Sequence, residues 1–110
     1  MSTGELAGRL RERVTIQRRN PARDAVAGAA GEWVEIGTAW AEIVPAAYAA
    51  QVSGDALAAM PCWRVTLRAP GAAIAIDDRM VWHGRMLRVR AIHVDPRTPD
   101  RITLHMEEQR

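Results

Sequence analysis

The sequence predicts an all-β fold, a small single-domain β-barrel or sandwich of about six or seven antiparallel strands. Three observations support this fold class. Apolar and polar residues alternate with a period of two along most of the chain, as they do in strands buried on one face. Glycines and prolines separate the alternating stretches at short intervals. Apart from one alanine-rich segment, no part of the chain has the periodicity of an amphipathic helix.

The N-terminal region contains a polar arm, a strand and a loop. Residues 1–12 form the arm, in which the spacing of Leu6 and Leu10 is compatible with a short helical turn or an extended segment. Residues 14–17 (VTIQ) alternate and are rich in β-branched side chains, so we expect a strand there. Residues 20–31 combine proline and glycine with little hydrophobic mass, which predicts a loop.

Two more strands are expected before the alanine-rich segment. Residues 32–36 alternate, and Gly37 interrupts the pattern because glycine weakens the interior of a strand. Residues 38–44 then resume the alternation and end at Pro45. The two stretches are therefore predicted as separate strands.

The second half of the chain has the clearest strand patterns. In residues 62–68 the apolar side chains of Trp63, Val65 and Leu67 share one face. Residues 102–107 alternate in the same way and predict the last strand. Both strands are expected to contribute to the core.

A β-hairpin is predicted between these two strands. Residues 80–82 and 85–94 read as its arms, and His83-Gly84 separates them. A glycine in a two-residue connection allows the positive φ that tight hairpin turns require. In the second arm, the apolar residues Leu87, Val89 and Ala91 are expected to line one face.

The segment Pro45–Pro61 does not match its surroundings. It is alanine-rich, bracketed by prolines and split by Ser53-Gly54-Asp55, and it has no deep apolar face. We expect a long loop or a short helix at residues 45–61. A long loop in a compact domain is commonly functional. The alternative is a short helix packed over the mouth of the barrel, because alanine favours helix.

The composition argues against several classes of function. The 110 residues carry a net charge of +2, all fifteen basic residues are arginine, and Cys62 is the single cysteine. The three histidines and Cys62 do not occur at metal-site spacing. No convergent carboxylates, nucleophile motif or glycine-rich phosphate loop is evident, so we expect no enzyme, no metal and no cofactor. Without a membrane helix or a secretory signal, we expect an intracellular origin.

An OB-like or SH3-like nucleic-acid-binding module is the alternative from another functional class. Arg64 and Arg68 lie on one predicted strand, and Arg85, Arg88 and Arg90 lie on another. Modules that bind single strands also stack bases on aromatic side chains. This chain has no phenylalanine and one tyrosine, and its four tryptophans mostly occupy expected core positions. We therefore favour arginines on a solvated or protein-contacting face.

Short motifs follow one another in a characteristic order along nearly the whole chain. The first, GRLRERVTIQ at residues 8–17, fits the pattern Gly-x-Leu-Arg-x-Arg-Val-x-Ile-Gln. The later ones are Trp40-Ala41-Glu42-Ile43 with Pro45, Arg64-Val65-Thr66-Leu67-Arg68, Asp78-Arg79-Met80 before Trp82-His83-Gly84-Arg85, and Arg101-Ile102-Thr103-Leu104 before Glu107-Glu108. As an ordered set, these motifs resemble the bacteriophage head–tail joining family, whose members are also called head–tail adaptor, head closure or stopper proteins.

The resemblance implies a structural virion protein, a head–tail connector of a long-tailed phage or a gene transfer agent. Such a protein forms a closed ring, expected here as a hexamer or dodecamer. The portal or adaptor ring lies on one side and the tail terminator or tail tube on the other. Double-stranded DNA passes through the channel without sequence-specific binding, and no membrane is involved. The implied location is the head–tail interface of a particle assembled in the bacterial host cytoplasm. A tail-terminator ring protein is the nearest structural alternative.

In stopper members of this family a long loop closes the channel after DNA packaging. The resemblance therefore makes the alanine-rich excursion the candidate channel-gating loop. Its residues are Ala46, Ala47, Tyr48, Ala49, Ala50, Gln51, Val52, Ser53, Gly54, Asp55, Ala56, Leu57, Ala58, Ala59 and Met60.

Four arginines near the N-terminus are the second candidate site. We expect Arg9, Arg11, Arg18 and Arg19 to contact acidic surfaces of the adjoining ring, with the N-terminal arm becoming ordered on assembly.

Overall fold

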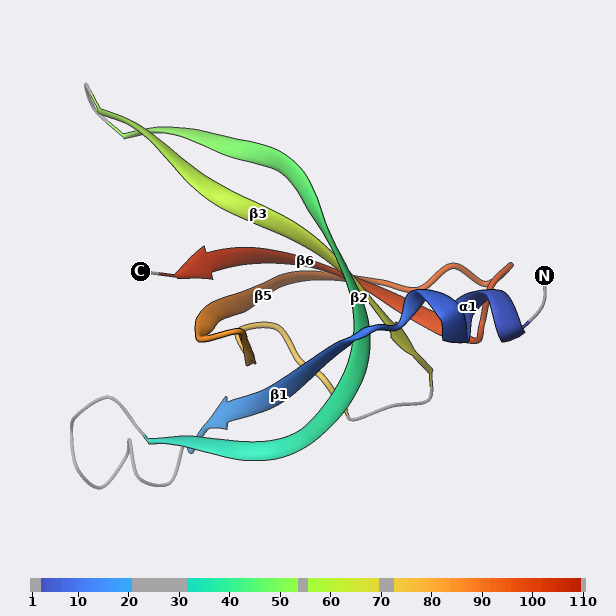
Figure 1. The fold of residues 1–110 in the computed structure, drawn as a ribbon. Helices are drawn as coiled ribbons and strands as arrows, with labels where there is room; N and C mark the ends of the chain where they lie inside the picture. Colours follow the sequence, from blue (N-terminus) through green and yellow to red (C-terminus); the bar gives the residue numbers. More distant parts are fainter. Residues whose placement is uncertain (1–2, 21–31, 54–55, 70–72, 110) are drawn as a thin grey trace.

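The computed structural model is a closed β-barrel with a short N-terminal helix and a hairpin that extends from one side (Figure 1). It describes residues 3–20, 32–53, 56–69 and 73–109, and within these the side chains of 6–20, 32–46, 61–69 and 73–109. The predicted loop at residues 20–31 lies outside the described residues, except for Asn20. The elements are α1 (Thr3–Arg9), β1 (Glu12–Arg19), β2 (Trp33–Ser53), β3 (Ala56–Arg68), β4 (Arg79–Trp82), β5 (Arg85–His93) and β6 (Arg101–Gln109).

Six strands form the barrel in the order β1-β2-β3-β6-β5-β4, and each pair of neighbours is antiparallel. The sheet closes where β1 pairs with β4, with Thr15 opposite Val81. Closure gives the barrel strands a partner on both sides and so removes free edges there. The predicted all-β class is confirmed, with a barrel as its form. Within the described residues, no helix is long and apolar enough to cross a membrane.

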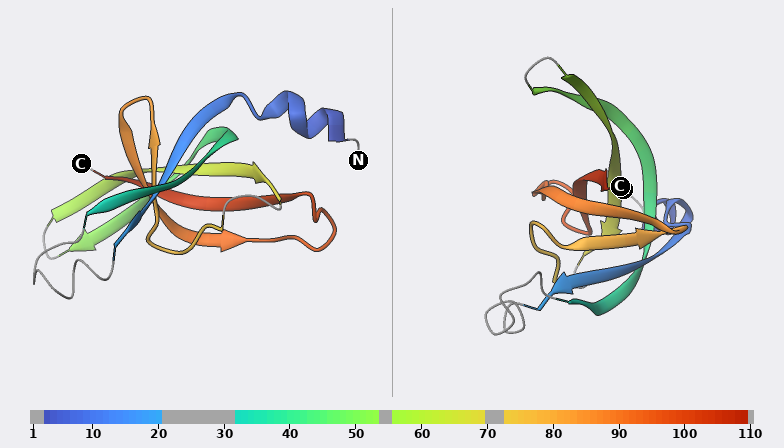
Figure 2. Two further views of the ribbon diagram at one scale, coloured as in Figure 1. Left: turned by 90° about the horizontal axis from the view of Figure 1, so that it is seen from below. Right: turned by 90° about the vertical axis from the view of Figure 1, so that its left-hand side faces the viewer.

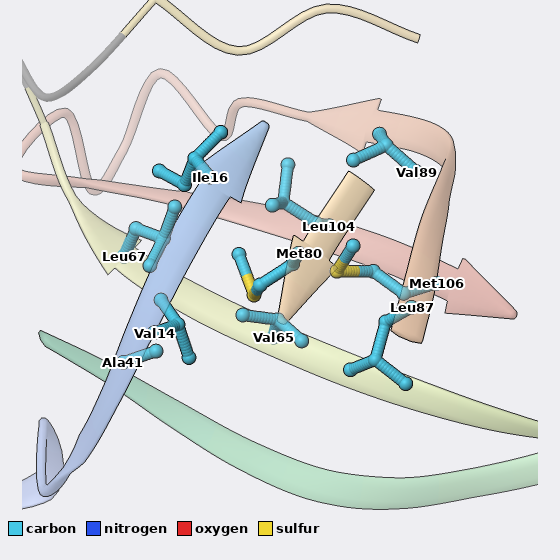
Figure 3. Close-up of a cluster of buried hydrophobic side chains, with 10 residues drawn as sticks. All are labelled: Val14, Ile16, Ala41, Val65, Leu67, Met80, Leu87, Val89, Leu104 and Met106. Atoms are coloured by element: carbon cyan, nitrogen blue, oxygen red, sulfur yellow. The ribbon is translucent and has the colours of Figure 1, made fainter. Parts of the chain in front are cut away.

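Side chains from all six strands fill the interior of the barrel (Figure 3). Inward-facing residues within a strand are spaced two apart, because successive side chains point to opposite faces. The predicted core faces of residues 62–68 and 102–107 are confirmed, and Trp63 and Ile102 pack against the core while remaining partly exposed. The buried cluster consists of Val14, Ile16, Ala41, Val65, Leu67, Met80, Leu87, Val89, Leu104 and Met106.

Gly37 marks a β-bulge rather than the end of a strand. The prediction of two strands in residues 32–44 is wrong, since β2 runs through Gly37 without interruption. Ile16 lies opposite Gly37 and Gln17 lies opposite Glu35, so Ile36 is the extra residue. A bulge lets a strand bend and twist more strongly while its ladder continues on either side. The glycine therefore signals local curvature in a single long strand.

A second bulge overturns the expectation for Ala91. The pairing of β5 with β6 shifts between Val89 and Ala91, so the alternation of side chains is reset at Arg90. Leu87 and Val89 are buried as predicted, whereas Ala91 is exposed.

The predicted hairpin at His83-Gly84 is confirmed. β4 and β5 pair up to Trp82 opposite Arg85, which leaves these two residues as the connection. Their φ angles are 49° and 76°, both in the left-handed region that a type I′ turn requires.

The alanine-rich segment is neither a long loop nor a helix. Both predictions for its conformation are wrong: residues 45–53 continue β2, and residues 56–61 begin β3. The two strands pair from Ala46 opposite Cys62 to Ser53 opposite Ala56, with a bulge between Ala46 and Ala49. Cross-strand hydrogen bonds thus override the helix preference of alanine. Pro45 lacks a backbone N–H, yet it fits in β2. The pairing of β1 with β2 ends at Ala41, so on that side of β2 no strand needs a hydrogen bond from residue 45.

An ion pair between a partly exposed arginine and a buried carboxylate fastens the end of β1 to the segment before β4. The Asp78 side chain is almost fully buried, and Arg18 donates to its carboxylate from Nε at 2.9 Å and Nη2 at 2.8 Å. The backbone N–H of Ala75 donates to the same carboxylate at 2.8 Å. Arg18 Nη2 also donates to the carbonyl oxygen of Ala73. These bonds satisfy a buried carboxylate at the seam where the barrel closes.

We predict that Asp78→Asn lowers the midpoint of thermal unfolding by several degrees, because it removes the charge that Arg18 holds while keeping the size of the side chain. Asp77→Asn is the matched control. Asp77 is exposed, has a φ of 74° that asparagine tolerates, and contacts Arg90 only at 3.5 Å. The control is expected to unfold close to wild type. Equal midpoints for all three proteins would contradict a structural role of the Arg18–Asp78 pair.

Candidate functional site

The candidate gating segment is a two-stranded hairpin that projects from the barrel. β3 pairs with β6 from Cys62 onward, and β2 pairs with β1 only up to Ala41. Beyond the pair formed by Ala46 and Cys62, the two strands therefore have only each other as described partners. Figure 1 shows the hairpin leaving the barrel at the upper left, and the right-hand view of Figure 2 shows it from the side.

The length of this hairpin suits it to reach another molecule. A strand rises about 3.3 Å per residue, so residues 47–53 of β2 carry the chain roughly 20 Å past the barrel. An isolated two-stranded hairpin is only marginally stable in water, and its outer edges expose unpaired backbone groups. The hairpin therefore has unused hydrogen-bonding capacity that a neighbouring molecule can take up.

The sequence gives the hairpin little charge. Residues 46–60 contain one carboxylate, Asp55, and no basic side chain. The side chains of residues 47–60 lie outside the described ones, so the assignment of these residues to a gating segment stays a prediction.

The four predicted interface arginines lie in two groups at opposite ends of β1. Arg9 and Arg11 flank the junction of α1 and β1, whereas Arg18 and Arg19 end the strand. Two of the four are held within the chain: Arg18 by Asp78, and Arg9 by Glu42 through a bidentate pair at 2.9 and 2.7 Å. Arg11 donates from Nε to the carbonyl oxygen of Gly8. The Cζ atom of Arg19 lies 5.0 Å from the centroid of the Trp33 ring.

The N-terminal arm is already attached to the barrel in the single chain. Its helix α1 buries Leu6 completely, and Arg9 in its last turn bonds to Glu42 in the middle of β2. The bonds from Arg9, aided by its charge, hold the pKa of the Glu42 carboxyl below its ordinary value of 4.5, although partial burial opposes this shift. The expectation that the arm orders only on assembly does not agree with these contacts.

Comparison with known proteins decides the family. A model of the phage head completion protein family matches residues 6–109, almost the entire chain. The chain belongs to this family. The match confirms the phage-family prediction that the ordered motifs suggested.

A solved structure supports the same fold. A chain from the "virion of native gene transfer agent (GTA) particle" superimposes with a TM-score of 0.67 at 19% sequence identity, and the alignment covers 92% of this chain and 96% of that one. The comparison with curated proteins found no match.

Family membership makes this head completion protein a structural component of the phage head, and it confirms the predicted location in the virion. Among the residues that the structure describes, no group of three or more histidine, cysteine, aspartate or glutamate side chains is arranged to hold a metal ion.

We predict that Glu42→Gln destabilises the head completion protein at neutral pH by about 0.2–1 kcal/mol, the range for an exposed ion pair. Because the pKa of Glu42 is lowered on folding, the pair contributes fully above pH 4.5 and its contribution is lost as the pH falls through the lowered value. The difference in unfolding midpoint between wild type and variant should therefore be smaller in acid, below pH 4.5, than at neutral pH. Glu35→Gln, an exposed site on the same strand, is the control and should unfold like wild type at both pH values. A difference that persists unchanged in acid would contradict the ion-pair explanation.

Proposed function

We propose that this head completion protein is a head–tail connector of the stopper type. In this role it is a ring subunit that joins the portal or adaptor complex to the tail and closes the DNA channel with its hairpin. The observation that carries the proposal is the extension of β2 and β3 beyond the barrel, where their outer edges have no strand partner in the described chain. Its work is structural rather than catalytic.

Ring formation accounts for two features of the surface. β2 presents Trp40, Val34 and Ile36 to solvent, with 53, 44 and 37% of their surfaces exposed. Exposed apolar residues beside arginines are typical of subunit contacts. In a closed ring each subunit uses one surface against the complementary surface of the next. A neighbouring subunit can also cover the edges of the hairpin.

A gate in a DNA channel has to block the path without adhering to the DNA. Phosphate attraction depends mainly on basic side chains, and residues 46–60 have none. The structural similarity to a chain of a gene transfer agent virion, a particle of the kind the motifs implied, supports a connector position. We propose the head–tail interface as that position, with double-stranded DNA passing through the ring.

The decisive variant removes the hairpin and keeps the barrel. Ala46 and Cys62 are paired, so replacing residues 47–61 with Asn-Gly closes the two strands with a tight turn. β3 keeps its pairing with β6, which begins at Cys62. We predict that the variant folds, assembles into heads and yields particles that lose packaged DNA, measured as DNA protected from nuclease per particle.

Two controls separate gating from assembly. The melting temperature of the isolated variant shows that the barrel is intact, and electron microscopy of the particles shows that the ring is present. Particles that contain the variant ring and retain DNA as wild-type particles do would contradict the gating role.

We also propose that the surface around the N-terminal arginines faces an acidic surface of the adjoining ring. Arg9 and Arg18 stabilise the fold, so reversing their charge tests folding rather than docking. Arg11 and Arg19 are exposed and have no carboxylate partner among the described contacts. Substitution of these two arginines therefore tests docking without breaking an ion pair of the fold.

We predict that Arg11→Glu with Arg19→Glu reduces incorporation of the protein into particles several-fold without lowering its melting temperature. Arg64→Glu with Arg68→Glu is the control for charge, because both of these side chains are exposed and lie on β3, which does not pair with β1. Quantitative immunoblotting of purified particles measures incorporation. Equal incorporation of wild type and the Arg11/Arg19 variant would exclude this interface.

A further inference from the structure

Three guanidinium groups surround one indole ring on the outside of the barrel. The Cζ atoms of Arg79, Arg19 and Arg88 lie 4.3, 5.0 and 5.3 Å from the centroid of the Trp33 ring. All three distances fall within the range of cation–π attraction. We call these four residues the Trp33 arginine cluster.

Four strands bring the cluster together. Arg19 at the end of β1 is the register partner of Trp33 at the start of β2, and Arg79 on β4 is the partner of Arg88 on β5. Met80 and Leu87, the neighbours of these two arginines, are buried in the core, so Arg79 and Arg88 point outward. The cluster is therefore specified by the closed barrel.

The charges in this cluster are not balanced by the chain. Like charges directly opposite on neighbouring strands are destabilising, yet Arg79 and Arg88 occupy such a pair. Glu107 lies opposite Arg88 in the register, but its carboxylate accepts from Arg90 Nη2 at 3.3 Å. Glu35 lies opposite Gln17, next to the cluster, and has no ion pair among the described contacts. Elsewhere in the described chain, arginines form ion pairs with nearby carboxylates, as Arg85 does with Glu108.

Three further observations show that positive charge in the cluster is poorly compensated within the described chain. The Nε atom of Arg88 is buried and has no hydrogen-bond partner, which is costly for a charged donor. Arg79 donates from Nε to Gln17 at 2.8 Å, an uncharged acceptor. Burial, followed by the charges of Arg88 and Arg19, lowers the pKa of Arg79 below its ordinary value. An anion bound to these guanidinium groups would offset the repulsion that Arg88 and Arg19 exert on Arg79.

We propose that the Trp33 arginine cluster is a binding site for a carboxylate from an acidic segment of a partner protein. The planar guanidinium groups offer paired donors that match a carboxylate, and a tryptophan among arginines is the composition of an interface hot spot. The site extends the predicted docking role of Arg19 to Arg79 and Arg88.

A compact site favours a protein carboxylate over DNA. Binding of duplex DNA uses several phosphates spaced along a groove and needs a track of basic side chains. This cluster instead converges on one ring at the start of β2, and β2 carries the hairpin at its other end (Figure 2). A protein bound here therefore contacts the barrel wall formed by β1, β2, β4 and β5. That the partner belongs to the particle rests on the proposed function, whereas the carboxylate site itself does not.

The test measures binding of an acetylated, amidated hexaglutamate peptide to the full chain by isothermal titration calorimetry at low and high salt. Arg79→Gln with Arg88→Gln removes two charges from the cluster, and Arg64→Gln with Arg68→Gln removes two exposed charges from β3 as the matched control. We expect the cluster variant to bind the peptide about tenfold or more weakly, because hydrogen bonds to charged groups are lost. The control variant should bind within about twofold of wild type.

Stability provides a second readout that does not depend on the choice of peptide. If the cluster is built for a ligand, Arg88→Met should raise the melting temperature of the unliganded chain by a few degrees, because it removes a buried unpaired donor and a like charge. A melting temperature that falls would show that Arg88 supports the fold, and would overturn the proposal.

Two binding outcomes would also overturn it. One is equal affinity of wild type and the cluster variant for the peptide, which would show that the peptide binds through the net charge of the chain and not at the cluster. The other is tighter binding of a short DNA duplex than of the peptide, lost in the same variant, which would make phosphate the ligand. Neither outcome bears on DNA retention by the hairpin variant, so the two proposals fail separately.

Discussion

The continuous pairing of β2 with β3 is the interaction on which the rest of the structure depends. It begins inside the barrel at Ala41 opposite Leu67, where β1 and β6 support it on either side, and runs to Ser53 opposite Ala56. The same backbone ladder is thus part of a packed wall at one end and a two-stranded hairpin at the other. The barrel fixes the direction of the hairpin, and the hairpin leaves backbone edges on which a neighbour can form hydrogen bonds.

Arginine has two different uses in this chain. Some arginines hold elements together: Arg18 bonds to buried Asp78 at the closing seam, and Arg9 connects α1 to Glu42. Others gather without an acidic partner, as Arg79 and Arg88 do beside Trp33. The first group stabilises one subunit, and the second costs that subunit stability. In the proposed assembly, binding of an acidic partner offsets this cost.

Local sequence patterns predict the features that depend on residues close together in the chain, such as the buried face of a strand or a tight turn. The alternation of residues 102–107 predicted the burial of Leu104 and Met106, and His83-Gly84 predicted its turn from the need for positive φ. Local sequence patterns do not predict contacts between segments that are far apart in the chain. Nothing near Arg9 in the sequence points to Glu42, and Trp33 meets Arg79 and Arg88 only because the barrel closes. The alanine-rich segment was assigned to a loop or a helix because its strand identity comes from cross-strand pairing, which local composition does not contain.

The most direct measurement of the central claim is an electron cryo-microscopy map of the DNA-filled particle that resolves the ring formed by this protein. If the hairpin is the gate, residues 47–60 point toward the ring axis, lie across the channel below the end of the DNA, and contact the same segment of neighbouring subunits. A map in which the hairpin points outward and leaves the channel open in filled particles would contradict it.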